Sequence, residues 1–292
     1  MTDDSKIRLT RRGVLASMGA VGAAAALGGA GTMAFFNDTE SFTGNRLVAG
    51  ELDLKMDWEE SYNGQLQEKV PPRPILSRAE IAIQFPSLSD AEVEAHFRDQ
   101  FRDVPDQLQA PVVAVDDVKP GDHGEVTFSL HLFDNPGYLW LGGGLDGNRE
   151  NGQSEPENET DATGGDPGVG LGEFGDAARA RIWYDENGDN VYQPGQEAEP
   201  NETLIVEDSL SAVLAALSQG IPLDGDRSTP ERDCYPNSTT QYLGFEWWVP
   251  VEVGNEIQTD SAAFTLSFYA EQCRHNDGST NPFGTPAPTT AN

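Results

Sequence analysis

Apolar and polar residues alternate along several short segments of the chain, which is the pattern of β-strands with one buried face. The alternation is clearest in residues 46–58, 178–185, 241–253 and 261–273. Residues 111–143 hold two or three more strands, separated by a tight Pro-Gly turn in the sequence KPGDHG. Short strands divided by turn signals predict an all-β fold, an antiparallel jelly-roll-like β-sandwich.

Two segments have helical periodicity and predict small helical insertions. The first is residues 87–101, which begin with Ser and Asp and carry apolar residues at helical spacing. The second is expected to begin near Asp208 or Ser209, directly after a strand. The apolar positions of the first helix are Val93, Phe97 and Phe101.

Other segments lack both periods and predict turns and loops. The sequence YNGQ (62–65) predicts a turn, and VPPRPIL (70–76) predicts a loop. Residues 142–175 are rich in Gly, Asp, Glu and Asn, which is typical of a long, mobile, acidic surface loop. Pro, Thr and Asn dominate residues 276–292, so we expect a disordered tail after one sandwich domain over 46–275.

The amino terminus has the features of an export signal. Residues 1–34 contain a basic start, the pair Arg11 and Arg12, and a weakly apolar stretch of Ala and Gly. This order resembles a cleaved twin-arginine signal and predicts an extracellular or cell-surface protein that meets the membrane only during export. Retention of the stretch as a membrane anchor is the alternative, which its many Gly and Ala residues disfavour.

Charge narrows the range of partners. The chain has 18 Lys and Arg against 49 Asp and Glu, which gives a formal net charge of −31. Nucleic acid and anionic lipid would be repelled, so neither is expected as a partner. A disordered acidic chain is the alternative, but 37% hydrophobic residues and five Trp favour a folded protein adapted to concentrated salt, which screens the charge.

The two cysteines, Cys234 and Cys273, both lie in the exported part. An even pair in an extracellular protein predicts a disulfide. Because His275 is close to Cys273, a zinc site that recruits further ligands remains the alternative.

The sequence YDENGDNVYQPGQE resembles a Ca²⁺-binding loop. Oxygen-bearing residues at every second position converge when such a loop curls, which suits a hard cation. Position six is Asn190 instead of Gly, and Asn tolerates the left-handed conformation needed there. A solvated acidic hairpin is the alternative. The expected Ca²⁺ ligands are Asp185, Asn187, Asp189, the carbonyl of Val191, and Glu197.

Motifs of enzymes are not found. The chain has no H-E-x-x-H, no G-x-S-x-G and no phosphate-binding Gly-rich loop, so we expect no catalytic residues. His131 alternates with Leu130 and Leu132 and is expected to face the surface. Four N-x-[ST] sequons are candidate glycosylation sites in an exported protein. They begin at Asn37, Asn158, Asn201 and Asn237.

The residues after the export signal resemble the start of the TasA/camelysin-like family, whose members carry a SipW-type signal. The likeness rests on MAFFNDTESFTGNRLVAGELDLKMDW (33–58), with an aromatic pair, Asp-Thr-Glu and a polar linker. VKPGDHGEVTFSLHL (118–132) resembles the Pro-Gly-Asp turn and strand of the family. RIWYDENGDN (181–190) and AFTLSFYAEQCRHN (263–276) resemble its haloarchaeal versions.

The resemblance implies a subunit of extracellular filaments. Family members include biofilm-matrix fibre subunits and archaeal bundling pilins, in which the amino-terminal strand of one subunit completes the sheet of the next. Here that strand would lie in residues 35–45 and would make the protein its own head-to-tail partner; pairing within one subunit is the alternative. The camelysin-type peptidase activity is not carried over, because no zinc-protease motif matches. The implied strand residues are Phe35, Phe36, Asp38, Thr39, Glu40 and Phe42.

We therefore expect a secreted, glycosylated, acidic β-sandwich that forms surface or matrix filaments, modulated by Ca²⁺. Two alternatives remain open. One is a monomeric adhesion or binding module that uses the long acidic loop as its contact surface. The other is a secreted metal-dependent hydrolase whose site has no recognisable motif.

Overall fold

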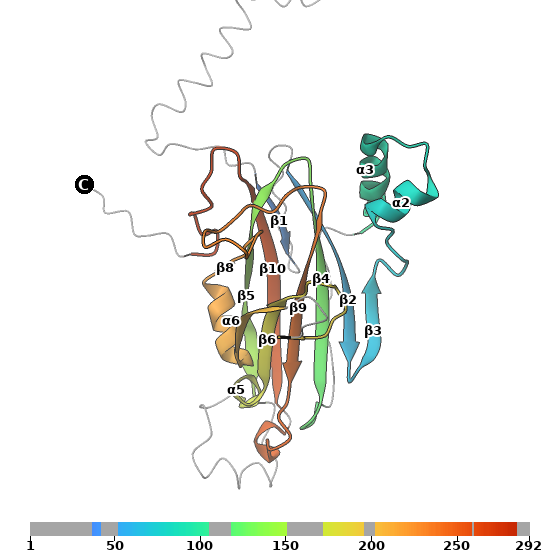
Figure 1. Cartoon of the computed structure of the whole chain (residues 1–292). Coiled ribbons are helices and arrows are strands. Elements are labelled where there is room, and N and C mark those ends of the chain that lie inside the picture. The colour runs from blue at the N-terminus through green and yellow to red at the C-terminus, as the bar shows by residue number, and fades with distance from the viewer. Residues whose placement is uncertain are drawn as a thin grey trace, which may run out of the picture. The chain divides into compact units, whose positions relative to one another are not determined.

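Two antiparallel β-sheets form the part of the chain that the structure describes (Figure 1). The structure is a computed structural model that describes residues 52–104, 118–150, 172–195, 202–258 and 260–284, together with the backbone of 37–41. The predicted all-β antiparallel sandwich is therefore confirmed. The strands are β1 (Asn37–Ser41), β2 (Asp53–Tyr62), β3 (Gln65–Val70), β4 (His123–Phe133), β5 (Gly137–Arg149), β6 (Arg179–Tyr184), β7 (Thr203–Ser209), β8 (Ile221–Pro222), β9 (Thr240–Trp248) and β10 (Ser261–Gln272).

The larger sheet has six strands in the order β3-β2-β4-β9-β6-β7, and the smaller has four in the order β1-β10-β5-β8. Short helices lie in the connections between these strands. None of the helices in the described residues is long and apolar enough to cross a membrane. The helices are α2 (Arg78–Gln84), α3 (Asp90–Asp99), α5 (Phe174–Ala177) and α6 (Leu210–Ser218), with a 3₁₀ turn, η1 (Asn255–Ile257).

Alternate residues of the strands meet between the two sheets and form the main core. On β2 the buried positions are Leu54, Met56 and Trp58, as the alternation predicts. Phe128 of the larger sheet and Phe268 of the smaller sheet meet edge to face, with ring centroids 5.2 Å apart. This contact joins the two layers directly.

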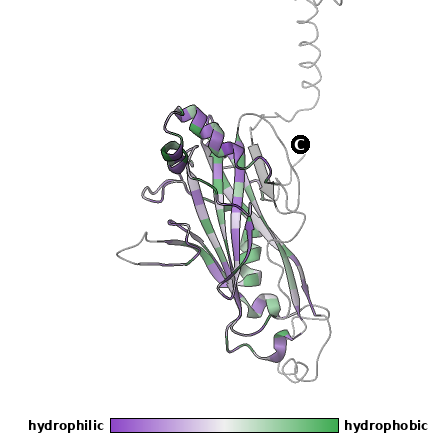
Figure 2. Ribbon diagram, turned by 90° about the vertical axis from the view of Figure 1, so that its right-hand side faces the viewer, coloured by the Kyte–Doolittle hydropathy of each residue, from purple (hydrophilic) through white to green (hydrophobic). Residues whose placement is uncertain are grey.

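Helix α6 closes the same core at its side. Ser209, at the predicted start, caps the helix by accepting a hydrogen bond from the Ala212 N–H. One face of the helix is buried in the sandwich, and Figure 2 shows α6 as a largely hydrophobic ribbon beside strands of alternating colour. The buried residues of α6 are Leu210, Val213, Leu214 and Leu217.

The turn predicted from YNGQ joins β2 to β3. Asn63 and Gly64 both have positive φ, 49° and 71°, as a two-residue hairpin turn of the right twist requires. The strand β3 that follows was not predicted, because its side chains are exposed and show no buried face. Its strand conformation comes from pairing with β2.

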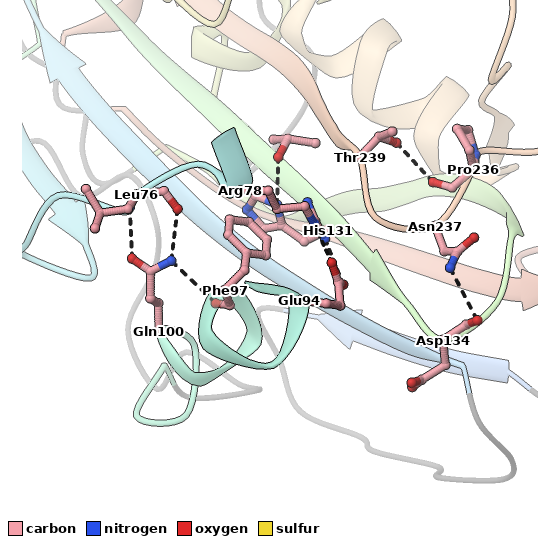
Figure 3. Close-up of polar contacts among 11 residues, drawn as sticks. Leu76, Arg78, Glu94, Phe97, Gln100, His131, Asp134, Pro236, Asn237 and Thr239 are labelled. Carbon is pink, nitrogen blue, oxygen red and sulfur yellow. Dashed lines mark hydrogen bonds and ion pairs between the residues drawn. The ribbon is translucent and has the colours of Figure 1, made fainter. Parts of the chain in front are cut away.

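A helical insertion covers the outer face of β4 with a second apolar cluster. Helix α3 confirms the prediction for residues 87–101, whereas α2 was not predicted. The Gln100 side chain accepts a hydrogen bond from the Leu76 N–H at 2.8 Å and donates one to the Leu76 carbonyl at 2.9 Å (Figure 3). These bonds join the segment before α2 to the end of α3. The buried members of the cluster are Ile81, Val93, Phe97, Phe101, Val104 and Phe133.

The loop expected over 142–175 begins later than the composition suggests. Strand β5 continues to Arg149, because the glycines of this stretch pair with β10, with Gly142 opposite Ser267. The expected tail also differs from the structure over residues 276–284. There Phe283 packs where a β-carbon of Gly142 would lie, and the Asn281 side chain donates to the Gln219 carbonyl at 2.6 Å. The composition of a segment does not show such tertiary contacts.

Cys234 and Cys273 form the predicted disulfide, with Cα atoms 6.4 Å apart. The bond ties the loop before β9 to the end of β10. The zinc alternative is therefore ruled out for this pair, since neither thiolate is free to bind a metal ion.

Candidate functional site

The acidic loop after β6 is organised around the carboxylate of Asp185. This side chain is 1% exposed and accepts hydrogen bonds from two loop N–H groups, Gly188 to Oδ1 at 2.7 Å and Asn190 to Oδ2 at 3.1 Å. Asn190 has the left-handed conformation that its position in the motif predicts, with φ of 63°. The loop therefore curls toward its first residue, as the Ca²⁺-loop interpretation requires.

Asp189 forms the second acidic point of the loop. Its Oδ1 accepts the Val191 N–H at 3.0 Å, and its Oδ2 accepts the amides of Asn187 at 2.9 Å and Gln193 at 2.7 Å. These donors orient the carboxylate, while Asn187 itself contributes an amide N–H here and its Oδ1 accepts the Asp189 N–H. Asp185 and Asp189 are thus brought together, and Asn187 lies beside them.

The third carboxylate of the site is Glu202, which the motif did not indicate. Its carboxylate lies within 4.8 Å of those of Asp185 and Asp189. Glu202 is 4% exposed; its Oε2 accepts the Gln193 N–H at 2.5 Å, while its Oε1 is buried without a hydrogen-bond partner. The predicted ligand Glu197 lies outside the described residues.

The pairing of β6 with β7 explains why Glu202 reaches the loop. Tyr184 and Thr203 are partners across the two strands, so the residue after the first and the residue before the second must be neighbours. Those residues are Asp185 and Glu202. A prediction of this hairpin and its register would have found Glu202, whereas the spacing of a continuous loop motif could not.

Electrostatics at the site are dominated by burial and like charge. Burial raises the pKa of Glu202 from its usual 4.5 to about 7; the Gln193 N–H lowers it, and the charges of Asp185 and Asp189, with a hydrogen bond from the protonated form to Asp185, raise it further. The donors are all oxygens, which suits a hard divalent cation better than zinc.

A cavity of about 300 Å³ lies between the acidic loop and the helical insertion. Its lining comes from the outer face of the larger sheet, including Asp57, Ser129 and Tyr242, and from the loop, including Asp189. Its wall combines apolar residues such as Val70 and Ile75 with polar ones, and it carries charges of both signs, since Lys69 lines it as well.

His131, expected at the surface, is instead buried at the wall of this cavity, with 2% of the residue exposed. The prediction was wrong because alternation assigns His131 to the outer face of β4 but does not reveal that α3 covers this face. Figure 3 shows Phe97 beside His131. The ring centroids of Phe97 and Phe101 lie 5.3 and 4.5 Å from the centroid of the imidazole. Nε2 lies 3.2 Å from Asp57 Oδ2 and Nδ1 3.1 Å from Thr240 Oγ1, so both ring nitrogens have partners.

The candidate polymerisation strand is represented by β1, at the edge of the smaller sheet. Its five residues pair with β10 of the same chain, from Asn37 opposite Glu271 to Ser41 opposite Ser267. Toward the start of β10, residues 262–266 pair with β5, and β1 reaches only as far as Ser267 within the described residues. Of the implied strand residues, Phe35, Phe36 and Phe42 lie outside the described residues.

The other predicted sites are partly described. Asn37 lies in β1, and Asn237 lies in the turn before β9, where its Nδ2 donates to the Asp134 carbonyl at 3.3 Å (Figure 3). The sequons at Asn158 and Asn201, and the pair Arg11 and Arg12, lie outside the described residues.

Comparisons with known proteins do not add to this description. No family model matches the chain, and no curated protein matches it. The resemblance to the TasA/camelysin-like family therefore stays a prediction that rests on the quoted motifs.

Proposed function

We propose that the protein is a secreted structural subunit that assembles into filaments by strand exchange, with β1 of one copy pairing with β10 of the next. The observation that carries the proposal is the place of β1. Among the described residues it is the first strand, it pairs with β10, and it lies at the end of the strand order of its sheet.

The geometry permits exchange because the same backbone hydrogen bonds form whether β1 comes from the same chain or from a neighbour. Residues 42–52 connect β1 to β2 and can span at most about 36–40 Å when extended. A connector of this length allows β1 to pair with β10 of its own subunit or with β10 of a neighbouring subunit. Head-to-tail exchange repeats without closing, which yields a filament.

An exchanged strand also has room to lengthen its pairing. If the register of β1 continues, Phe42 falls opposite Leu266, a buried residue of β10. The pairing of the exchanged strand would then extend along β10 beyond Ser267. The net charge of −31 opposes contact between copies in dilute buffer, and salt screens this repulsion, so assembly is expected to increase with salt concentration.

The test is a cross-link between two different chains. One batch of mature protein carries Ser41→Cys and a second carries Ser267→Cys, two residues that face each other across β1 and β10. Paired residues of this kind lie close enough for a disulfide. After the batches are mixed and oxidised, we expect cross-linked dimers on a non-reducing gel and filaments in electron micrographs.

Ser261→Cys is the matched control, because it lies on the same strand but about 20 Å from Ser267. Ser41→Cys and Ser261→Cys should give no dimer. A chain that carries both Ser41→Cys and Ser267→Cys should, when oxidised as a monomer, be locked in its own pairing and fail to polymerise. Filaments that form equally well from this locked chain, or from mature protein without residues 35–45, would refute strand exchange.

A further inference from the structure

The carboxylates of Asp185, Asp189 and Glu202 meet at the base of the β6–β7 hairpin, where one oxygen of the Glu202 carboxylate is buried and receives no hydrogen bond from a donor group. We propose that these three residues bind one divalent cation of the Ca²⁺ class, with Glu202 supplying the ligand that the sequence motif assigned to Glu197. The proposal does not depend on strand exchange.

The first argument is the unpartnered oxygen. Buried polar atoms in proteins are nearly always paired, and an unpaired carboxylate oxygen is especially unfavourable. Glu202 is 4% exposed and fixed through Oε2 by the Gln193 N–H, so its Oε1 cannot turn to solvent without breaking that bond. A cation between the three carboxylates would satisfy this oxygen.

The second argument is uncompensated charge. None of the ion pairs found between described residues includes Asp185, Asp189 or Glu202. The nearby arginines have other partners: Arg227 pairs with Glu186, and Arg181 pairs with Glu246. Three carboxylates within 4.8 Å therefore lack a protein cation, and a bound metal ion would provide the missing positive charge.

The third argument concerns the kind of ion. Two oxygens on opposite sides of Ca²⁺ are about 4.6–5.2 Å apart, and about 4.0–4.2 Å apart around Mg²⁺. The three carboxylates lie within 4.8 Å of one another, a limit that ligands of either ion meet, so the argument for Ca²⁺ rests on their number. Mg²⁺ usually keeps several waters and binds one or two carboxylates, whereas Ca²⁺ takes six to eight oxygens in a flexible geometry. Loop N–H groups hold Asp185 and Asp189 in place; the Oδ1 atom of each accepts one N–H, from Gly188 and Val191 respectively, and keeps a lone pair for the metal.

A cation here would fasten the loop to the sheet. Asp185 follows the end of β6, Glu202 precedes β7, and Asp189 belongs to the loop between them. The ion would thus fix both ends of the hairpin and the loop wall of the 300 Å³ cavity, which includes Gly188, Asp189 and Asn190.

The test is calorimetric titration of the metal-free mature protein with CaCl₂ in concentrated salt, together with melting curves in Ca²⁺ and in chelator. Wild type is expected to bind Ca²⁺ saturably, more tightly than Mg²⁺, and to melt at higher temperature when Ca²⁺ is present. Glu202→Gln, which keeps the shape and removes the charge, is expected to bind at least tenfold more weakly. In chelator this variant should melt no lower than wild type, which shows that it folds.

Two controls separate the site from other acids. Glu207→Gln changes an exposed residue of β7 and should leave binding unchanged. Asp260→Asn changes a second group of carboxylates, formed with Glu150 and Glu173, and should leave the Ca²⁺-dependent rise in melting temperature intact. The proposal is overturned if Glu202→Gln binds like wild type, if Asp260→Asn alone abolishes the effect, or if Mg²⁺ binds as tightly as Ca²⁺.

Discussion

Trp183 and Gly244 are partners across β6 and β9, and the indole ring lies over the glycine at the place where a β-carbon would project. The ring is fully buried, and Tyr192 of the acidic loop covers it with a centroid distance of 5.7 Å. Gly244 is therefore required by close packing and not by an unusual backbone conformation.

Gly244→Ala is expected to destabilise the protein by about 1–3 kcal/mol, because the added methyl group overlaps the indole of Trp183. Chemical denaturation would measure the change. Gly144→Ala is the matched control, since it also lies in a strand but a β-carbon there meets no atom within 4 Å. Equal effects of the two substitutions would contradict the packing argument.

Phe97→Ala is expected to lower stability by about 3–5 kcal/mol, because it removes the ring that packs on His131, Phe101 and Phe133 beneath the helical insertion. The Arg78 guanidinium also lies 4.0 Å from the centre of this ring. Phe85→Ala, at a residue that is 37% exposed, should change stability by less than about 1 kcal/mol. Hydrogen exchange should show the loss of protection in α2 and α3 first; uniform loss across both sheets would argue against local coupling.

Glu60 makes stability fall as the pH rises. It lies on the core-facing side of β2 with 6% exposure, and burial, followed by the charge of Glu68, raises its pKa from 4.5 to about 7. Between these values the folded protein binds more protons than the unfolded chain, so its contribution to stability is lost as the pH increases from about 4.5 through 7.

Glu60→Gln should therefore be more stable than wild type at pH 8, by about 1–3 kcal/mol, and the two should converge near pH 5. Denaturation curves at constant ionic strength, with chelator present, would test this. Glu59→Gln is the neighbouring control: its side chain is 43% exposed and pairs with Lys69, so a change under about 1 kcal/mol is expected. A pH-independent difference between Glu60→Gln and wild type would contradict the assignment.

Replacement of both disulfide cysteines, Cys234→Ser with Cys273→Ser, is expected to lower stability by about 2–4 kcal/mol. The bond closes a loop with a sequence separation of 39, so its loss increases the conformational entropy of the unfolded chain and lowers the free energy of unfolding. Denaturant midpoints would show the effect, and wild type in reductant should match the double variant. Unchanged midpoints would mean that the loop stays closed through other contacts.

Local patterns predicted those elements whose own residues carry the signal. The alternation of Leu52, Leu54 and Met56 marks β2, and Ser209 marks the start of α6, because one buried face or one cap suffices. Strand β3 shows no such face, since its conformation depends on its partner.

The sites were harder to predict because they combine distant segments. Asp185 and Asp189 follow from the loop motif, whereas Glu202 joins them only through the register of β6 and β7. His131 was placed on the correct strand but on an exposed face, because nothing near it in sequence reveals that Phe97 and Phe101 cover it.

The four outer strands of the two sheets differ in how readily they accept another strand. Strand β3 carries charged Glu68 and Lys69 beside an irregularity in its pairing, β7 has a similar irregularity and an acidic end, and β8 is two residues long and contains Pro222. These are features by which proteins discourage edge-to-edge addition. If copies join as proposed, subunits are therefore added only through β1 and β10. The filament would then have a single polarity, and it would not branch through the other edges of its sheets.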